Sequence, residues 1–398
     1  MKKIERISQK EREYVLQVLD GAFSSNCNYT MITQLEKKFA EKIGCKYAIA
    51  MTNGTATLHM ALEAAGVGEG DEVICPPLTM SSTSLAVLHA NAIPVFADVD
   101  ENTFVITADS IKDKITKKTK AIITVSLYGL SPDMDPIVAL AHDKNIIVIE
   151  DDAQCFLAEY KNKCVGTLGD MASFSFQSSK HMTAGEGGII VTDDADLALK
   201  LRQYSGLGYG SIGLEKGRIT KDDIQNPQYD RHIVLGWNYR PSDLIGAVAL
   251  GQLERLDELV EMRRIAANHF MNAIKDCDWI HPQAVPDNCK HSYWAFCATL
   301  DTDRIEWGEF RKKFMQLGGD GIYSAWKLSY LEPAYLNMNF LGREKYIKAY
   351  GNYEYHQGLC PIAEKLQAKM LQFKTNYWDE RDAVRQADLL RKTISYFS

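Results

Sequence analysis

The sequence predicts an α/β protein with a large three-layer domain, built on a mostly parallel sheet, and a smaller α+β domain at the C-terminus. Two observations carry this prediction. Between about residues 46 and 192, short β-rich runs alternate with helical patterns, as in parallel sheets covered by helices on both faces. The chain has 398 residues, which exceeds the size at which a single hydrophobic core usually stops growing. We expect the two domains to cover residues 1–255 and 256–398.

The alternating region begins with a predicted strand at residues 47–51, which an amphipathic helix at residues 55–65 follows. Short runs of apolar and β-branched residues predict further strands at residues 73–75, 95–97, 121–125 and 146–149. A helical pattern at residues 135–143 lies between the last two of these strands. Ligands of such sheets bind outside the carboxyl ends of the strands, so residues directly after each strand are candidates for function.

Residues 205–240 interrupt this rhythm. A glycine-rich run at 206–210 is followed by a polar stretch up to Arg231, which predicts a long loop or lid. The G-x-G-x-G pattern resembles a dinucleotide-binding loop but lacks the strand before it and the helix after it. A long helix should then begin near Pro241, because a helical apolar pattern continues through Leu253, Leu256 and Leu259.

The composition argues against several classes of function. Hydrophobic residues make up 46% of the chain and charged residues 24%, as in globular proteins. The net charge of -7 and the lack of a long basic run argue against nucleic acid or an anionic membrane as the main partner. No apolar run reaches the roughly 18 residues of a membrane-spanning helix, and residues 1–6 lack the apolar core of a secretory signal.

The cysteines and histidines show no pattern of disulfides or metal ligands. The nine cysteines contain no C-x-x-C pair, which suits reduced thiols in a cytoplasm better than a disulfide framework. The nine histidines contain no H-E-x-x-H or comparable spacing. We therefore expect a cytoplasmic protein without a metal site.

Four local patterns carry candidate chemistry. Residues 53–56 join a strand to a helix, where N–H groups and a glycine can bind a phosphate, although many such turns hold glycine for packing only. Residues 150–154 end a buried strand, where a carboxylate can hold the ring nitrogen of a cofactor or simply begin a solvated loop. Lys180 lies between small polar residues and a glycine-rich turn, a setting in which a partly desolvated amine can form a Schiff base. The fourth pattern is Gly-Trp-Asn-Tyr-Arg at residues 236–240.

Seven ordered segments resemble the DegT/DnrJ-type sugar aminotransferases, a branch of the fold-type-I pyridoxal-phosphate enzymes. They extend from about residue 47 to 264 and so cover the whole large domain. The segments are NGTATLHMAL, GDEVICPPLT, PVFADVD, KAIITVSLYG, VIEDDAQ, GDMASFSFQSSKHMTAGEGGIIVTDD and GWNYRPSDLIGAVALGQLERLDELVEMRR. The resemblance implies the fold-type-I architecture, pyridoxal 5′-phosphate as the cofactor, and a transfer of an amino group.

The resemblance also implies roles for the matching residues on the ring side of the cofactor. Lys180 would bind the cofactor covalently and then move a proton between the substrate carbon and the cofactor. Asp151 would pair with the pyridinium nitrogen, and Gln154 would hydrogen-bond the phenolic oxygen of the ring. Met80 stands where family members commonly carry an aromatic residue, and its thioether would cover the ring face less rigidly.

The phosphate of the cofactor would be held from two subunits. In one subunit the backbone amides of Thr55 and Ala56 would bind it together with the hydroxyl of Ser175. Asn238 would reach the phosphate of the other subunit, so the resemblance implies a homodimer with shared active sites.

The substrate side departs from the family pattern. Ser126 replaces the usual histidine before Leu-Tyr-Gly, and residues 325–327 replace the usual Pro-Leu-His segment. Lys327 is a candidate to contact a substrate phosphate or else a surface lysine. His181 is a further candidate substrate residue, although its neighbour Lys180 already explains the chemistry.

The expected reaction passes an amino group from glutamate, or alternatively glutamine, to a ketone on a nucleotide-linked deoxysugar. The departures leave open a keto-cyclitol or a small phosphorylated ketone as the substrate. A sugar dehydratase of the same family would carry histidine in place of Lys180. A non-catalytic regulator would be expected to lose Lys180 or Asp151, and this chain retains both.

Overall fold

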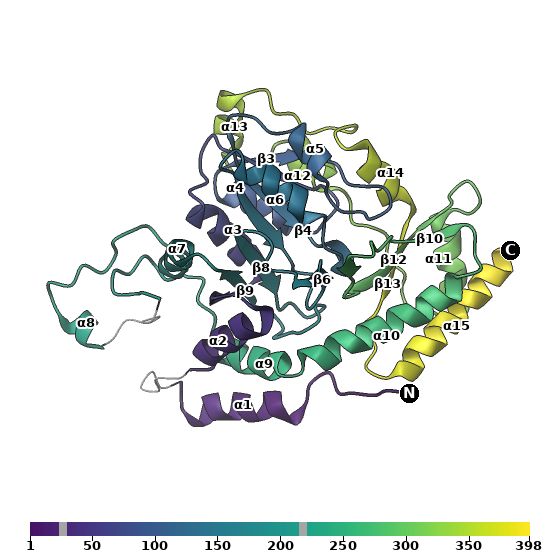
Figure 1. Cartoon of the computed structure of the whole chain (residues 1–398), viewed down its shortest axis with the longest axis horizontal. Coiled ribbons are helices and arrows are strands. Elements are labelled where there is room, and N and C mark those ends of the chain that lie inside the picture. The colour runs from purple at the N-terminus through teal and green to yellow at the C-terminus, as the bar shows by residue number, and fades with distance from the viewer. Residues whose placement is uncertain (24–29, 215–220) are drawn as a thin grey trace.

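The computed structural model describes residues 1–23, 30–214 and 221–398. Its centre is a seven-stranded sheet in which β9 is antiparallel to both of its neighbours and the other pairs are parallel (Figure 1). The mostly parallel sheet confirms the predicted fold class, and each predicted strand ends within two residues of its expected bounds. In spatial order the strands are β1 (Tyr47–Met51), β9 (Gly188–Thr192), β8 (Met171–Ser175), β5 (Ile147–Asp151), β4 (Thr119–Val125), β2 (Glu72–Cys75) and β3 (Ile93–Phe96).

Both faces of this sheet are buried, which makes the domain three-layered. On β1, Ala48 and Ala50 pack with helices α2 and α9, whereas Ile49 and Met51 pack with α3 and α7. This alternation follows from the two-residue period of a strand, because successive side chains point to opposite faces. The helices of this part are α1 (Gln9–Asp20), α2 (Met31–Ile43), α3 (Gly54–Ala64), α4 (Ser82–His89), α5 (Ala108–Lys112), α6 (Met134–His142), α7 (Ala195–Ser205) and α9 (Asp243–Leu253).

The single long helix expected from residue 241 onward was wrong. Ser242 caps α9, which ends at Leu253, and a second helix, α10 (Leu256–Ile274), begins after a two-residue break. Tertiary contacts explain the break. Arg255 donates a hydrogen bond to the Glu11 carboxylate at 3.1 Å, and the Glu254 carboxylate binds Lys38 at 2.6 Å. The apolar pattern continues across these positions, so it does not indicate the break.

A smaller sheet lies beyond this break. It contains β10 (Ile280–Pro282), β12 (Ala295–Leu300) and β13 (Met370–Lys374), which are all antiparallel. Helices α10, α11 (Trp307–Gln316) and α15 (Glu380–Phe397) contribute to one core with this sheet, around Phe270, Phe296 and Phe373. The proposed domain boundary at 255/256 coincides with the start of α10.

Part of the C-terminal half returns to the large sheet. The rings of Tyr330, Tyr335 and Tyr355 lie 5.3, 5.8 and 5.9 Å from the ring of Phe96 on β3. The proposed boundary therefore separates the two sheets but does not separate their cores. The remaining elements are η1 (Leu127–Gly129), η2 (Ser329–Leu331), α12 (Pro333–Leu336), α13 (Glu344–Tyr350), α14 (Pro361–Lys369) and a small sheet of β6 (Glu159–Tyr160), β7 (Lys163–Cys164) and β11 (Cys289–Lys290).

Parts of the expected loop, within residues 205–214 and 221–240, project from the body of the molecule (Figure 1), and residues 215–220 of that loop lie outside the described residues. Backbone bridges join the two limbs of this excursion, Gly206 with Asn238 and Tyr209 with His232. The limbs meet closely at Gly208, where a Cβ would lie 1.8 Å from the carbonyl oxygen of Val234. The glycine-rich run follows helix α7 rather than a strand, and the described part of the excursion includes only the short helix α8 (Lys221–Gln225). Within the described ranges, none of the helices has the length and apolar character needed to cross a membrane.

We expect Gly188→Ala to lower the free energy of unfolding by about 1–3 kcal/mol, because an added methyl overpacks the junction of β9 with the start of α3. A Cβ at Gly188 would lie 2.6 Å from the backbone carbon of Asn53 and 2.8 Å from the nitrogen of Gly54. Urea unfolding measures the change. Gly68→Ala is the control, since no atom lies within 4 Å of a Cβ there. Equal effects of the two substitutions would contradict the prediction.

Candidate active site

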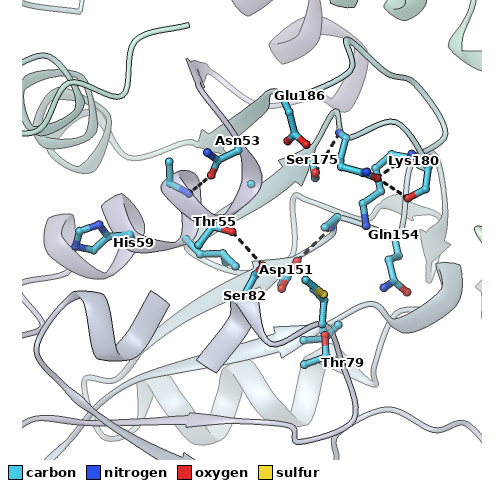
Figure 2. A pocket seen from close by; sticks show the side chains of 18 of the residues that line it. Asn53, Thr55, His59, Thr79, Ser82, Asp151, Gln154, Ser175, Lys180 and Glu186 are labelled. Atoms are coloured by element: carbon cyan, nitrogen blue, oxygen red, sulfur yellow. Dashed lines mark hydrogen bonds between the residues drawn. The ribbon is translucent and has the colours of Figure 1, made fainter. Parts of the chain in front are cut away.

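A cavity of about 720 Å³ opens at the carboxyl edge of the large sheet. Val125 ends β4, Asp151 ends β5 and Ser175 ends β8, and all three residues line the cavity. The start of α3 lies at the same edge (Figure 2). Parallel strands place their last residues together in this way, so side chains distant in the sequence meet in one cavity of the size that holds small ligands.

Lys180 lies in the turn after β8 and is 7% exposed. Burial lowers the pKa of its amine to about 8, the Asp151 carboxylate opposes this change, and the Arg263 guanidinium adds to it. The amine also lies 4.9 Å from the centre of the Trp294 ring. A lysine with a pKa near neutrality is partly uncharged, which suits an amine that acts as a nucleophile and as a proton carrier.

Asp151 points into the same cavity (Figure 2). The hydroxyl of Thr83 donates to its carboxylate at 2.7 Å, and the backbone N–H of Ala153 donates to the other oxygen at 3.3 Å. Burial raises the pKa of Asp151, whereas Thr83 and Lys180 lower it. A cationic ring nitrogen bound beside this carboxylate would lower its pKa further and hold it ionised.

Gln154 presents an amide group to the cavity. Its Oε1 accepts a hydrogen bond from the backbone N–H of Tyr128 at 2.9 Å. An N–H can donate only to the oxygen of the amide, so this contact fixes which way the amide faces. The NH₂ group of Gln154 is then the donor available to an oxygen atom of a ligand.

The start of α3 forms an anion-binding turn. The first N–H groups of a helix have no partner within the helix, and its positive end attracts anions. Asn53 caps this helix and accepts from the N–H of Ala56 at 2.8 Å, while the Thr55 hydroxyl donates to Ser82 at 3.0 Å. A Cβ at Gly54 would lie 3.0 Å from the Cβ of Ser175, so glycine keeps the turn close to the end of β8.

The structure brings together most of the residues expected at the site. Those that line the cavity are Thr55, Ala56, Met80, Asp151, Gln154, Ser175 and Lys180. Met80 is 47% exposed. Asn238 is exposed and does not line the cavity of this one chain, so its expected contact with the phosphate of another subunit stays a prediction.

The two substrate candidates do not line the cavity. His181 is fully buried, its Nε2 is hydrogen-bonded to the carbonyl of Ser292 at 3.0 Å, and burial lowers its pKa well below the usual value. Successive residues of the turn point in different directions, so the side chain beside Lys180 enters the protein core. Lys327 is exposed, and the adjacent Trp326 lines the cavity instead. The geometry does not support a substrate role for either residue.

Several cavity residues escaped the sequence analysis. The rings of Trp294 and Trp326 lie 6.3 Å apart and line one part of the cavity. His59 is hydrogen-bonded to the hydroxyl of Tyr239 at 3.2 Å, and both residues line another part. Tyr239 belongs to the Gly-Trp-Asn-Tyr-Arg pattern, which was the available signal, whereas no local pattern marks Trp294.

The two acids beside Asp151 have different surroundings. Glu150 accepts hydrogen bonds from the backbone N–H groups of Gly166, Leu168 and Gly169, at 3.1, 2.8 and 2.8 Å. Asp152 is fully buried, and within the described residues neither of its carboxylate oxygens forms a hydrogen bond of normal geometry. Burial and the nearby Glu150 raise the pKa of Asp152 well above its usual value.

A buried lysine and a carboxylate face one cavity at the carboxyl edge of a mostly parallel sheet, with an anion-binding turn beside them. This arrangement defines a fold-type-I pyridoxal-phosphate enzyme, and the residues fit that cofactor. The model of the DegT/DnrJ/EryC1/StrS aminotransferase family matches residues 5–371, and the chain belongs to this family. It is a pyridoxal-phosphate-dependent aminotransferase, as the resemblance implied.

Individual relatives agree with this assignment. The GDP-perosamine synthase of Escherichia coli O157:H7 is 39% identical over 289 residues, which cover 72% of this chain and 74% of that protein. A putative L-glutamine:3-amino-2,3-dideoxy-scyllo-inosose aminotransferase of Micromonospora echinospora is 36% identical over 257 residues, 64% of this chain and 58% of that protein. The solved structure of the aminotransferase from Psychrobacter cryohalolentis superposes with a TM-score of 0.86 at 28% identity, over 98% of both chains.

We expect the substitutions Asp151→Asn and Asp152→Asn to have opposite outcomes. Asp151→Asn removes the charge that faces Lys180 and the cofactor, so kcat/KM of the cofactor-loaded enzyme should fall roughly 100-fold, about 3 kcal/mol. Asp152→Asn should stay within about threefold of the native value, because Asp152 does not line the cavity and its raised pKa favours the neutral form, which asparagine resembles. Near-normal turnover of Asp151→Asn would refute the assignment.

Stability against pH provides an independent check on Asp152. In the unfolded chain this acid loses its proton above about pH 4, whereas the folded chain retains the proton up to the raised pKa. The native protein should therefore lose stability as the pH rises through this window. Asp152→Asn should remove that part of the loss, which thermal unfolding at several pH values would measure. Parallel pH profiles of the two proteins would contradict the protonated state.

Proposed function

We propose that the chain transfers an amino group from glutamate to the keto group of a nucleotide-linked deoxysugar. The observation that carries the proposal is the meeting of the Lys180 amine and the Asp151 carboxylate in one buried cavity. The substrate class is supported by the GDP-perosamine synthase relative. The cavity extends beyond these two residues to Trp294, Trp326 and Tyr239, which gives apolar and aromatic walls for a ligand larger than the cofactor.

Lys180 would carry the central proton transfer. Pyridoxal phosphate, when bound, supplies a carbonyl carbon for covalent attachment and a ring that withdraws electrons from the substrate carbon. With a pKa of about 8, the Lys180 amine can attack as a free base and, once released, can take a proton from the donor amino acid and return one. Asp151 would hold the ring nitrogen protonated, which strengthens that electron withdrawal, and the Gln154 NH₂ would donate to the phenolic oxygen.

The phosphate would bind at the start of α3. The N–H groups of Thr55 and Ala56 and the hydroxyl of Ser175 are the expected donors. In this structure the N–H of Ala56 donates to the Asn53 side chain at 2.8 Å, so Asn53 holds the turn in which these donors lie. Met80 would cover one face of the ring with its thioether.

The functional unit would be a cytoplasmic homodimer. Asn238 is exposed, and a backbone bridge joins it to Gly206. A second chain placed there would bring Asn238 to the phosphate of its partner. The scattered cysteines support a reducing compartment, since those that the structure describes are all unpaired.

A keto-cyclitol with glutamine as the donor is the second candidate. The Micromonospora relative favours it, because its name describes an L-glutamine-dependent reaction on an inosose. A sugar dehydratase is disfavoured because Lys180 is present where that branch carries histidine. The retained Lys180 and Asp151 likewise disfavour a regulator without catalysis. A small phosphorylated ketone remains a third possible substrate.

The substrate proposal is tested with purified, cofactor-loaded enzyme. We expect a GDP-linked keto-deoxysugar with glutamate to give an amino sugar and 2-oxoglutarate, both measured by mass spectrometry. Lys180→Ala should fold and lose this activity by at least about 1000-fold, because it lacks the proton carrier. Borohydride reduction of the native enzyme should fix the cofactor on Lys180. Amination of scyllo-inosose but not of the nucleotide sugar would favour the second candidate, and a deoxygenated ketone without amine would indicate a dehydratase.

Hybrid dimers test the shared site. Lys180→Ala and Asn238→Asp should each inactivate a homodimer, the second because a carboxylate beside the phosphate repels it. Mixing and reassociating the two variants should give hybrids with one native and one doubly defective site. Random pairing makes half of the dimers hybrid, so activity should recover to about a quarter of the native value. If subunit exchange is demonstrated and activity stays at zero, the site is not shared.

A further inference from the structure

Two arginine side chains hold the turn that carries Lys180. Arg263 lies on α10 and is 1% exposed, and its Nη2 donates to the carbonyl oxygens of Ser179 and Lys180 at 2.7 and 2.9 Å. Arg6 reaches the turn from the N-terminal segment and donates to the carbonyls of Lys180 and His181 at 2.9 and 2.7 Å. Three successive carbonyls are therefore fixed, and that of Lys180 accepts from both guanidinium groups.

The second nitrogen of Arg263 connects the turn to the smaller sheet. Its Nη1 donates to the carbonyl of Trp294 at 2.8 Å and to the hydroxyl of Thr375 at 3.2 Å. The indole N–H of Trp294 donates in turn to the carbonyl of Ser179 at 3.0 Å. The same arginine thus holds the backbone under Lys180 and the aromatic ring that lies beside its amine.

The charge of Arg263 is buried without a neutralising carboxylate. Burial and the nearby Arg6 lower its pKa, and no acidic group of the described residues contributes a compensating rise. A guanidinium keeps its proton inside proteins, so carbonyl dipoles stabilise this positive charge. The charged groups that act on the Lys180 amine come from three elements: Asp151 at the end of β5, Glu186 in the following turn, and Arg263 on α10. Arg263 is the one whose charge disfavours the ammonium form.

We propose that Arg263 is a positioning residue for Lys180, because its guanidinium fixes the backbone of the turn that carries this lysine and the backbone of Trp294 beside it. This inference rests on the proposed role of Lys180 as the cofactor lysine. The bidentate guanidinium spans carbonyls on two segments, so it sets the direction in which the lysine side chain enters the cavity. The positive charge of Arg263 also lowers the pKa of the Lys180 amine, whereas the carboxylates of Asp151 and Glu186 raise it.

The test measures the amine in the cofactor-free protein. Trace labelling with acetic anhydride at a series of pH values, followed by peptide mapping, gives the midpoint at which Lys180 becomes reactive, with the exposed Lys37 as a reference. We expect a native midpoint near pH 8. Arg263→Gln should raise the midpoint by about one pH unit, because one nearby positive charge is lost. Circular dichroism and thermal unfolding confirm that each variant is folded.

Two further variants separate charge, geometry and general packing. Arg263→Lys keeps the positive charge but loses the planar guanidinium and its several hydrogen bonds. The labelling midpoint of Lys180 should therefore move by less than about half a pH unit. The kcat of the cofactor-loaded enzyme should fall about tenfold, with the KM for the amino donor nearly unchanged. Arg264→Gln is the matched control. Its side chain also lies on α10 and donates to the carbonyls of His291 and Leu157, at 3.1 and 2.7 Å, away from the lysine turn. The labelling midpoint of Lys180 in Arg264→Gln should equal that in the native protein.

Several results would overturn the proposal. The first is a labelling midpoint of Lys180 in the native protein that equals that of the exposed Lys37. The second is an unchanged Lys180 midpoint in folded Arg263→Gln. The third is a Lys180 midpoint that shifts as much in Arg264→Gln as in Arg263→Gln. Failure of Arg263→Lys to fold would also overturn it, because the arginine would then be a structural requirement alone. Failure of the proposed function is a different result, since borohydride would then fix the cofactor on a lysine other than Lys180.

Discussion

Burial of the Lys180 amine is the constraint on which the rest of the site depends. Removal from water lowers the pKa of the amine to about 8, so small electrostatic contributions decide its protonation near neutral pH. The contributions come from separate parts of the fold: Asp151 from the large sheet, and Arg263 from the helix that packs on the smaller sheet. The relative position of the two sheets therefore controls the chemistry of one amine.

The cofactor side of the site could be predicted from the sequence because its signals are local. Asp151 and Ser175 each end a strand, Thr55 lies in the first turn of α3, and Lys180 follows in the turn after β8. Parallel strands bring such residues to one edge whatever the connections between them, so the strand pattern indicates which residues meet there. The role of each residue toward the cofactor came from the family resemblance, because each local pattern also has a purely structural interpretation. The predicted strands match for the same reason, since continuous apolar runs between helical patterns have few alternative structures.

The remaining features depend on partners far away in the chain. Arg263 and Arg264 are adjacent in one amphipathic helix, and only contacts such as that with Ser179, 84 residues earlier, make Arg263 the buried one. The break between α9 and α10 likewise arises from Glu11, 244 residues before Arg255. In residues 325–327 the sequence left Lys327 open as a phosphate ligand or a surface lysine; in the structure Lys327 is exposed and Trp326 lines the cavity. In irregular segments the side chains follow no regular period, so the sequence pattern cannot predict the direction in which each one points.

The three consecutive acids at the end of β5 show how the fold restricts charge. Three buried carboxylates cannot all stay ionised, because each unpaired charge loses its hydration and repels its neighbours. Glu150 keeps a set of three backbone N–H donors that also fixes the loop 166–169. Asp152 has no such set of backbone donors, and burial beside Glu150 raises its pKa although the Ser126 hydroxyl opposes this change. Asp151 alone combines a hydroxyl donor, a facing amine and access to the cavity. Of the three acids, Asp151 is thus the one that has hydrogen-bond donors and also faces Lys180 in the cavity.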